Sequence, residues 1–303
     1  MFKTLSNGQR ISFTEYNKDR SKSILFLHGN SEDSHTYDSL IDSLSDYHLI
    51  LMDSRGHGES DKGKLSYKLM AEDAYLLLNE LNIDEKNPRW EDRDRVVLSK
   101  GHCSPALYAS LAERGFFDKE KLKDFRKIES NLQGHPDMNK VPGVDMTSGS
   151  LGQGLSVANG IAIAGKMDKK NYRVYCILGD GEIEEGQIWE AAMTSNKYDL
   201  DNLCVIVDNN NLQIDGTIEE VMSPYPIDEK FKSFGFNVIN IDGHNYEEIL
   251  NAFKKAREFK GKPTCIVAKT IKGKGVSFME NKAEWHGKAP SEEQYEIAMN
   301  ELK

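Results

Sequence analysis

The sequence is poor in the features that mark membrane and secreted proteins. Its 303 residues contain four widely spaced cysteines without a CxxC or Cys/His pattern, so no disulfide framework is predicted. No apolar run approaches the roughly 18 residues that cross a bilayer, and the N-terminal stretch MFKTLSNGQRISF has no signal-peptide core. We therefore expect no membrane partner and a location in the reducing cytoplasm.

The sequence also has fewer basic than acidic residues. Lys and Arg number 39 against 49 Asp and Glu, which gives a formal net charge of -10. An acidic surface disfavours nucleic acid as a partner. It does not exclude a phosphorylated ligand, because backbone N–H groups and a bound cation hold phosphate whatever the overall charge. With 38% hydrophobic and 29% charged residues, the chain is expected to fold.

No internal repeat or low-complexity linker interrupts a regular alternation of short apolar runs and amphipathic stretches. The runs are rich in Val, Ile and Leu, which is typical of strands buried on both faces of a parallel sheet. The alternation predicts an α/β fold with a doubly wound, mostly parallel sheet. The expected strands span residues 10–16, 23–28, 48–53, 174–178, 204–208, 237–241 and 264–269. The expected helices span residues 67–81, 105–114, 119–127, 152–166, 188–198 and 246–259.

Two histidine- and glycine-containing motifs occur in the first quarter of the chain, within SILFLHGNSEDSHTYDSLIDSL and HLILMDSRGHGESDKG. They resemble the start of an α/β-hydrolase, in which residues 28–30 would form the oxyanion hole and residues 53–58 a turn after an early strand. The chain has no G-x-S-x-G turn, so it lacks that family's nucleophile. We therefore predict a truncated α/β-hydrolase-like segment over residues 1–83. An esterase is the unfavoured alternative. We interpret His28, Asp53, His57 and Ser60 as structural residues without a catalytic role.

Carboxylate and amide side chains follow two apolar runs in the later part of the chain. Asp180 lies in Gly179-Asp180-Gly181, directly after VYCIL, and Asn210 lies in VIVDNNNLQIDG. The carboxyl ends of parallel strands meet at one edge of a sheet, where α/β proteins bind ligands. Glycine lets the backbone approach a phosphate, and the side-chain oxygens suit a hard cation. The alternative is a pair of turns without any ligand.

This pair of motifs resembles the magnesium site of the thiamine diphosphate enzymes. In that family, a GDG aspartate, a downstream asparagine and a main-chain carbonyl two residues later bind Mg²⁺, which bridges to the diphosphate of the cofactor. The resemblance assigns the metal to Asp180, Asn210 and the carbonyl of Leu212. It also places Gly181 and Asn210 beside the cofactor.

Three longer blocks narrow the resemblance to transketolase, with deoxyxylulose phosphate synthase as a less favoured match. They are WEDRDRVVLSKGHCSPALYASLAERG, LQGHPDMNKVPGVDMTSGSLGQGLSVANGIAIA and KTIKGKGVSFMENKAEWHGKAP. The resemblance implies that His102, His135 and His286 line the substrate channel and that His102 and His286 also contact the cofactor. It implies that Gly149, Ser150 and Leu151 contact the aminopyrimidine of the cofactor. It makes Glu185 a buried acid that links the two active sites of a dimer, and the alternative for Glu185 is a solvated carboxylate at the start of a helix.

Two parts of a complete transketolase are missing from the sequence. There is no SGHPG-type block, and no pyrimidine-binding domain with its activating glutamate. We therefore expect residues 84–303 to form the thiamine diphosphate-binding domain of a split transketolase, as its N-terminal subunit. Such a subunit would need a C-terminal partner subunit to transfer a two-carbon ketol unit between sugar phosphates. The resemblance implies a homodimeric core or an α2β2 assembly. The alternative is an inactive fusion that only associates with such a partner.

Overall fold

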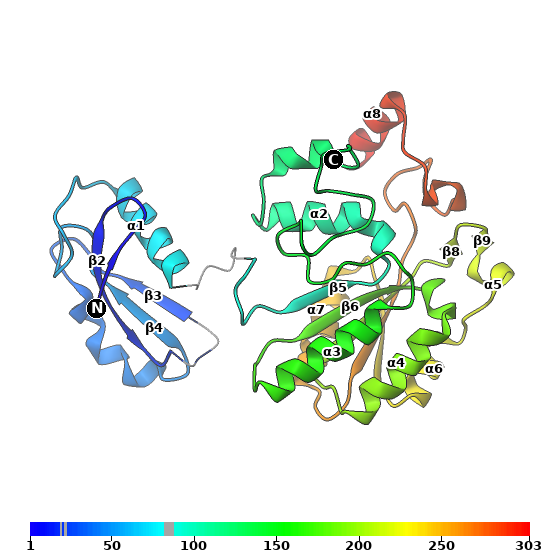
Figure 1. The fold of residues 1–303 in the computed structure, drawn as a ribbon, viewed down its shortest axis with the longest axis horizontal. Helices are drawn as coiled ribbons and strands as arrows, with labels where there is room; N and C mark the ends of the chain where they lie inside the picture. The colour runs from blue at the N-terminus through cyan, green and yellow to red at the C-terminus, as the bar shows by residue number, and fades with distance from the viewer. Residues whose placement is uncertain (19, 21–22, 82–87) are drawn as a thin grey trace. The chain divides into compact units, whose positions relative to one another are not determined.

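The computed structural model describes residues 1–18, 20, 23–81 and 88–303 (Figure 1). Its contacts divide the chain into two compact units, Met1–Asp92 and Arg93–Lys303. The domain boundary expected between residues 83 and 84 falls in the stretch 82–87, outside the described residues. In the part of the chain that is described, no helix combines the length and the apolar character needed to cross a membrane.

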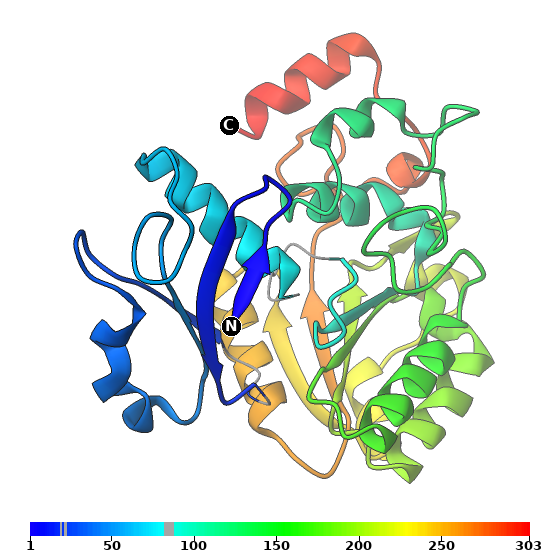
Figure 2. The ribbon, with the colours of Figure 1, turned by 60° about the vertical axis from the view of Figure 1, so that its left-hand side comes forward.

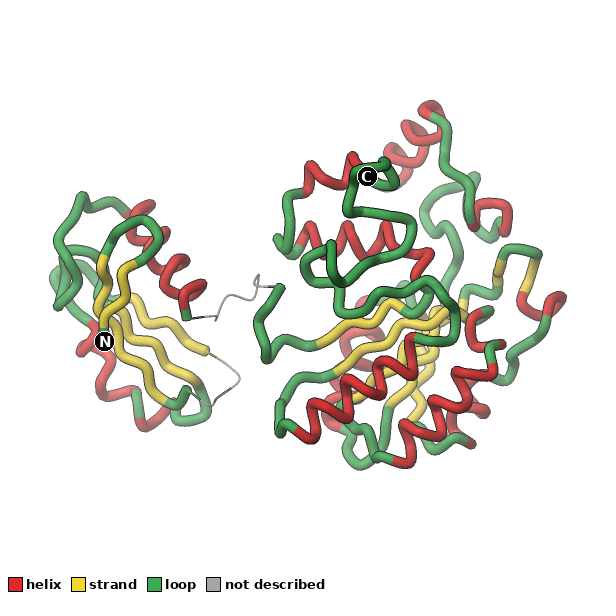
Figure 3. Tube along the Cα trace, viewed as in Figure 1, coloured by secondary structure: helices red, strands yellow, loops and turns green. Residues whose placement is uncertain are grey.

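The N-terminal unit is built on a four-stranded sheet in the order β1-β2-β4-β3, with its strands drawn in yellow in Figure 3. Its elements are β1 (Phe2–Thr4), β2 (Arg10–Tyr16), β3 (Ser23–Leu27), η1 (Ser34–Leu40), η2 (Asp42–Leu44), β4 (His48–Met52) and α1 (Tyr67–Glu80). The strand β4 pairs antiparallel with β2 and parallel with β3, and all its residues are buried. Ile50 and Met52 of β4 belong to a core with Ala74 and Leu77 of α1. The helix α1 therefore covers one face of this sheet.

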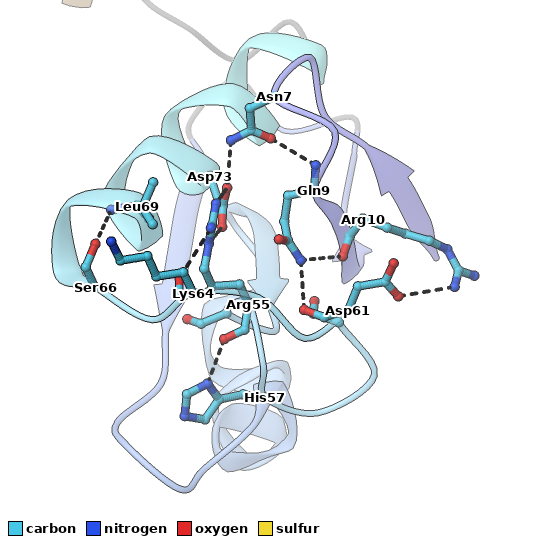
Figure 4. A network of polar contacts seen from close by, with 12 residues as sticks. Asn7, Gln9, Arg10, Arg55, His57, Asp61, Lys64, Ser66, Leu69 and Asp73 are labelled. Carbon is cyan, nitrogen blue, oxygen red and sulfur yellow. Dashed lines mark hydrogen bonds and ion pairs between the residues drawn. The ribbon is translucent and has the colours of Figure 1, made fainter.

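A buried ion pair ties α1 to the loops of the N-terminal unit (Figure 4). The guanidinium of Arg55 donates two hydrogen bonds of 2.6 Å to the carboxylate of Asp73, whose side chain is 0% exposed. Asp73 also accepts a hydrogen bond of 3.0 Å from Asn7, in the turn between β1 and β2. One carboxylate on α1 thus holds both the turn after β4 and the first β-turn in place.

The C-terminal unit contains a five-stranded sheet whose paired neighbours are all parallel, in the order β10-β11-β7-β6-β5. A two-stranded antiparallel ribbon, β8 with β9, lies outside it. The elements are β5 (Arg95–Leu98), η3 (Gly101–Cys103), α2 (Ser104–Glu113), η4 (Lys119–Asp124), α3 (Gly154–Met167), β6 (Val174–Gly179), η5 (Glu182–Glu184), α4 (Gly186–Lys197), β7 (Leu203–Asn209), β8 (Leu212–Gln213), β9 (Gly216–Thr217), α5 (Ile218–Val221), α6 (Ile227–Ser233), β10 (Asn237–Asp242), α7 (Tyr246–Glu258), β11 (Thr264–Lys269), η6 (Ala283–His286) and α8 (Glu292–Glu301).

Helices cover both faces of the five-stranded sheet. Alternate residues of β7 point to opposite sides, so Val205 packs with α3, α4 and α6, whereas Cys204 packs with α7. Figure 2 shows the yellow-orange helix α7 on one side of the strands and the green helices α3 and α4 on the other. The doubly wound parallel sheet expected from the sequence is confirmed in this unit.

One predicted helix is wrong, and one strand of the five-stranded sheet was not expected. The helix expected over residues 119–127 is wrong, because a 3-10 helix spans only Lys119–Asp124. Phe125 turns to an extended conformation, and Arg126, at a φ of 60°, donates its N–H to the carbonyl of Leu132 instead of continuing the helix. The edge strand β5 was not expected, although its apolar residues are buried against β6.

The parallel arrangement brings four turns to the same edge of the sheet. The turns after β5, β6, β7 and β11 all leave the carboxyl ends of their strands. This is the edge at which open α/β sheets bind ligands. Helices α2 and α3 also begin here, so their backbone N–H groups contribute positive potential to this region.

Candidate functional site

A cavity of about 1140 Å³ lies at the carboxyl edge of the five-stranded sheet. The turns after four strands form its polar walls, and apolar side chains of the sheet, such as Ile177, Ile206 and Ile266, line its other side. A cavity with one apolar wall and a few converging polar groups is typical of a cofactor or substrate site.

Asp180 and Asn210 lie in the turns after the adjacent strands β6 and β7. The Asp180 carboxylate is 2% exposed and accepts hydrogen bonds from Asn211 N at 2.5 Å, Asn209 Nδ2 at 3.1 Å and Gly181 N at 2.9 Å. Burial raises the pKa of Asp180, and these three donors oppose the rise. Within the described residues this carboxylate has no ion-pair partner inside 4.0 Å, so a cation at its side would offset its desolvation.

The turns that hold Asp180 and Asn210 offer oxygen atoms. Asn210 Oδ1 accepts a hydrogen bond of 3.2 Å from Leu212 N, which brings the amide oxygen and the main chain of Leu212 into one turn. The described residues contain no cluster of three or more His, Cys, Asp or Glu side chains able to hold a metal. The Asp180 carboxylate, the Asn210 amide oxygen and the Leu212 carbonyl would form an all-oxygen set, which is the kind that Mg²⁺ prefers.

A half-buried lysine–aspartate pair lies beside this turn. Lys100 Nζ and Thr270 Oγ1 both donate to the carboxylate of Asp208, which also accepts from Asn210 Nδ2 at 3.2 Å. Burial raises the pKa of Asp208, but the Lys100 ammonium outweighs it and holds the pKa below its usual value. The pair ties the turns after β5, β7 and β11 together, and both of its side chains line the cavity.

Two histidines from distant parts of the chain meet across the cavity. The rings of His102 and His286 stack with centroids 5.0 Å apart, and His286 Nδ1 lies 3.3 Å from Lys272 Nζ. Burial, followed by the charges of His286 and Lys100, lowers the pKa of His102 to about 4. Burial and the Lys272 ammonium also lower the pKa of His286. Both rings are thus neutral at pH 7, and each has one nitrogen that donates and one that accepts.

Glycines allow three turns to pack closely at the cavity wall. A Cβ on Gly101 would lie 2.6 Å from Ser148 Oγ and 2.8 Å from Gly149 N, so a larger residue there would push the turn of His102 away. A Cβ on Gly149 would lie 3.1 Å from the ring of His135, and Gly149 has a φ of 151°. The glycines therefore set how near the histidine-bearing turns come to the glycine-rich stretch.

Comparisons with known proteins show the family of the chain. The family model described as "Transketolase, thiamine diphosphate binding domain" matches residues 44–302 of the chain. The chain belongs to this family. It is a subunit of a transketolase-type transferase, and the cofactor of the family's domain is thiamine diphosphate.

Named subunits of transketolases are among the similar proteins. The chain is 46% identical over 230 residues to the 6-deoxy-6-sulfo-D-fructose transketolase subunit SqwG of Clostridium sp. (strain MSTE9), covering 76% of this chain and 84% of that protein. It is 46% identical over 215 residues to an apulose-4-phosphate transketolase subunit of Phocaeicola vulgatus, covering 71% and 76% respectively.

Longer transketolases match the same part of the chain. The solved transketolase of Campylobacter jejuni has a TM-score of 0.68 at 36% identity, covering 74% of this chain and 37% of that chain. The human transketolase is 46% identical over 218 residues, which is 34% of its length. The chain therefore spans about a third of the length of these transketolases.

Most residues singled out from the sequence line the transketolase-type cavity, but two do not. Ser150 and Glu185 are exposed and lie outside its lining, with Glu185 at the N-cap of α4. The backbone of Gly152 packs against Glu185, where an added Cβ would lie 2.9 Å from the glutamate Cβ. The lining contains His102, His135, His286, Gly149, Leu151, Asp180, Gly181, Asn210 and Leu212.

Several polar residues of the cavity were missed in the sequence. Lys100 stands two residues before His102, and Glu182 directly follows the GDG turn, so their position in the motifs was an available signal. Asp208, two residues before Asn210, and Thr270 also lie inside motifs that were singled out, but their contact with each other and with Lys100 joins segments that are distant in the sequence.

Three residues singled out in the first quarter of the chain hold the backbone of the N-terminal unit together. His28 Nε2 accepts a hydrogen bond of 2.9 Å from Ser54 N, and Asp53 accepts from Ser34 N at 2.8 Å and from Glu59 N at 3.0 Å. Ser60 Oγ donates to the carbonyl of Asp53 at 2.7 Å. The likeness of this segment to an α/β-hydrolase stays a prediction.

Proposed function

We propose that this chain binds thiamine diphosphate through a magnesium ion and completes a ketol-transferring active site with a C-terminal partner subunit. The observation that carries the proposal is that Asp180 accepts a hydrogen bond from Asn211 N, in the turn that holds Asn210 and Leu212, and that all three residues singled out line a cavity with cationic and histidine side chains. The substrates proposed are a ketose phosphate and an aldose phosphate.

The metal and the diphosphate are assigned to the polar wall of the cavity. Asp180, Asn210 and the Leu212 carbonyl hold Mg²⁺, and Gly181 lets the backbone approach the diphosphate. The ammonium groups of Lys100 and Lys272 offset the negative charge of that group. When bound, thiamine diphosphate supplies the carbon–carbon bond chemistry, which the protein orients.

The three histidines are assigned to the substrate and the reacting end of the cofactor. Neutral His102 and His286 donate one hydrogen bond and accept another, so they orient sugar hydroxyls and move protons without a change in the net charge of the cavity. His135, packed on Gly149, lies beside the stretch of Gly149, Ser150 and Leu151 that is proposed to contact the aminopyrimidine. The apolar wall on the sheet keeps water from the reacting end.

A partner is proposed because relatives of similar length carry the word subunit in their names. Ser150 and Glu185 fit this proposal, since both are exposed in the chain by itself and are free to be covered in a homodimeric core or an α2β2 assembly. Glu185 would then be the buried acid that joins two sites.

Residues 1–83 are proposed to be a structural, α/β-hydrolase-like segment, and residues 84–303 the thiamine diphosphate-binding domain. No chemistry is assigned to the first segment, because the chain has no G-x-S-x-G turn and the side chains of His28 and Asp53 accept hydrogen bonds from the backbone. We propose a cytoplasmic location, because the cysteines of the described chain are free thiols, as is usual in a reducing compartment.

Calorimetric titration of thiamine diphosphate into the chain with Mg²⁺ tests the proposal. The wild type is expected to bind, Asp180→Ala to lose binding, and EDTA to reverse it. The matched control is Asp168→Ala, which removes an exposed carboxylate at the end of α3 and is expected to bind as the wild type does. Absence of binding both alone and with a C-terminal transketolase subunit would instead support an inactive fusion.

A further inference from the structure

One buried carboxylate of the cavity wall has no assigned part in holding the metal, the cofactor or the substrate. Glu182 follows the GDG turn directly, in η5, and is 3% exposed. A carboxylate this far from water requires hydrogen-bond donors around it, because desolvation of its charge is costly. Its partners therefore show what it holds.

The Glu182 carboxylate joins three chain segments that are far apart in sequence. Its Oε1 atom accepts hydrogen bonds from Ser99 Oγ, after β5, and from Gly152 N at 3.0 Å, before α3. Its Oε2 atom accepts from Gly179 N at 3.0 Å, at the end of β6. All three partners donate, so an acceptor-only carboxylate matches them.

Ser99 extends this connection to the start of α3. Its hydroxyl accepts a hydrogen bond of 3.1 Å from Gly154 N, while donating to Glu182. A Cβ on Gly154 would lie 2.3 Å from Ser99 Cβ, so the two backbones touch without a side chain between them. The geometry leaves little freedom for one segment to shift alone.

We propose that Glu182 is a positioning residue that fixes three walls of the cofactor site relative to one another. The segment after β5 carries Lys100 and His102, the segment before α3 carries residues 149–151, and the end of β6 carries Asp180. This inference rests on the proposed function for its consequence, the strength of cofactor binding. The connection itself is a property of the chain without any ligand.

The matched replacement is Glu182→Gln, which keeps the shape of the side chain and puts an NH₂ group against one of the three donors. A hydrogen bond to a charged group is replaced by a donor–donor contact, so the segments separate locally. We expect amide hydrogen exchange at Gly152, Gly154 and Gly179 to accelerate at least tenfold, while amides of β7 keep their wild-type rates. The control is Glu190→Gln, an exposed carboxylate on α4, with wild-type exchange throughout.

The same variants are then titrated with thiamine diphosphate and Mg²⁺. Glu182→Gln is expected to raise the Kd about tenfold or more, and Ser99→Ala to do so by a smaller factor in the same direction. The double variant should be no weaker than Glu182→Gln alone, because both changes remove one connection.

The outcomes separate this inference from the proposed function. A wild type that does not bind thiamine diphosphate overturns the proposed function, whereas the exchange rates of the ligand-free chain still decide the positioning role. Unchanged exchange at the three glycines in Glu182→Gln overturns the inference, as does acceleration spread evenly over β7, which is the mark of general destabilisation. If the wild type binds and Glu182→Gln binds equally well, the positioning role is also rejected.

Discussion

His102 and His286 stack at 5.0 Å although nearly the whole C-terminal unit separates them in sequence. Their planes differ by 25°, and Lys272 lies against His286 on the side of Nδ1. Neither imidazole has an acidic partner among the contacts described for it, and positive charge surrounds both. The arrangement keeps the rings neutral and favours an anionic ligand.

This arrangement predicts a pH dependence of stability. The pKa of His102 is about 4 in the folded chain against an ordinary value of 6.5, so the unfolded chain binds more protons between these values. Stability is therefore full above pH 6.5 and falls as the pH drops toward 4. In urea unfolding between about pH 5 and 7, His102→Asn is expected to show a flatter dependence of the unfolding free energy on pH. An equal slope in both proteins would contradict the lowered pKa.

Lys272 gives a prediction about charge. Burial lowers the pKa of Lys272, and its Nζ atom lies 3.3 Å from Nδ1 of the neutral His286 ring. We expect Lys272→Met to weaken binding of thiamine diphosphate with Mg²⁺ about tenfold, because a charged hydrogen bond is lost. Lys274→Met is the control, because Lys274 is exposed and its Nζ atom pairs with Glu280 Oε1 at 3.9 Å. Titrations at two salt concentrations measure the effect, and equal loss in both variants would argue against a site-specific charge.

Two glycines of α3 should respond in opposite directions to alanine. In Gly154→Ala the new Cβ would lie 2.3 Å from Ser99 Cβ, and we expect a loss of about 2 kcal/mol in unfolding free energy. Gly160 has nothing within 4 Å of such an atom and lies inside the helix, so Gly160→Ala is expected to gain about 0.5–1 kcal/mol. Denaturant unfolding of both variants measures the difference. Similar effects from both substitutions would show that the close approach of Gly154 to Ser99 is unimportant.

The ion pair of the N-terminal unit predicts a large stability change. Asp73→Asn leaves the buried Arg55 guanidinium without its carboxylate, which costs roughly 3–5 kcal/mol. The control is Asp61→Asn, because the Arg10–Asp61 pair in Figure 4 is exposed, with atoms 3.7 Å apart, and contributes below about 0.5 kcal/mol. Hydrogen exchange of the β4 amides reports the stability of this unit. Comparable exchange rates in the two variants would mean that the buried Arg55–Asp73 pair stabilises this unit no more than the exposed pair does.

Much of the C-terminal fold was predictable because its buried strands are continuous apolar runs. The runs at β6, β7, β10 and β11 were expected nearly to their ends. The strand β5 was not, because RVVL is short and follows the charged stretch WEDRDR. Its assignment depends on pairing with β6, which is a tertiary contact that local sequence does not encode.

The site was predictable where a motif is local and not where it depends on distant partners. Asp180 and Asn210 follow strands that could be recognised, so their proximity followed from parallel topology. The roles of Glu182 and Asp208 depend on Ser99 and Lys100, which reach them only after β5 joins the sheet. The sequence left Glu185 open between a buried acid and a solvated helix-start carboxylate, because burial at that position depends on what packs over it.

The position of β5 has a consequence for how the cavity opens. Among the described strands, β5 has β6 as its neighbour and ends the sheet, and it is four residues long. Edge strands with few hydrogen bonds open before central ones. The wall with Lys100 and His102 therefore depends on the hydrogen bond from Ser99 to Glu182 for its position, whereas the wall with Asp180 and Asn210 follows strands that are paired on both sides. Loss of that hydrogen bond would release the edge wall before the central one.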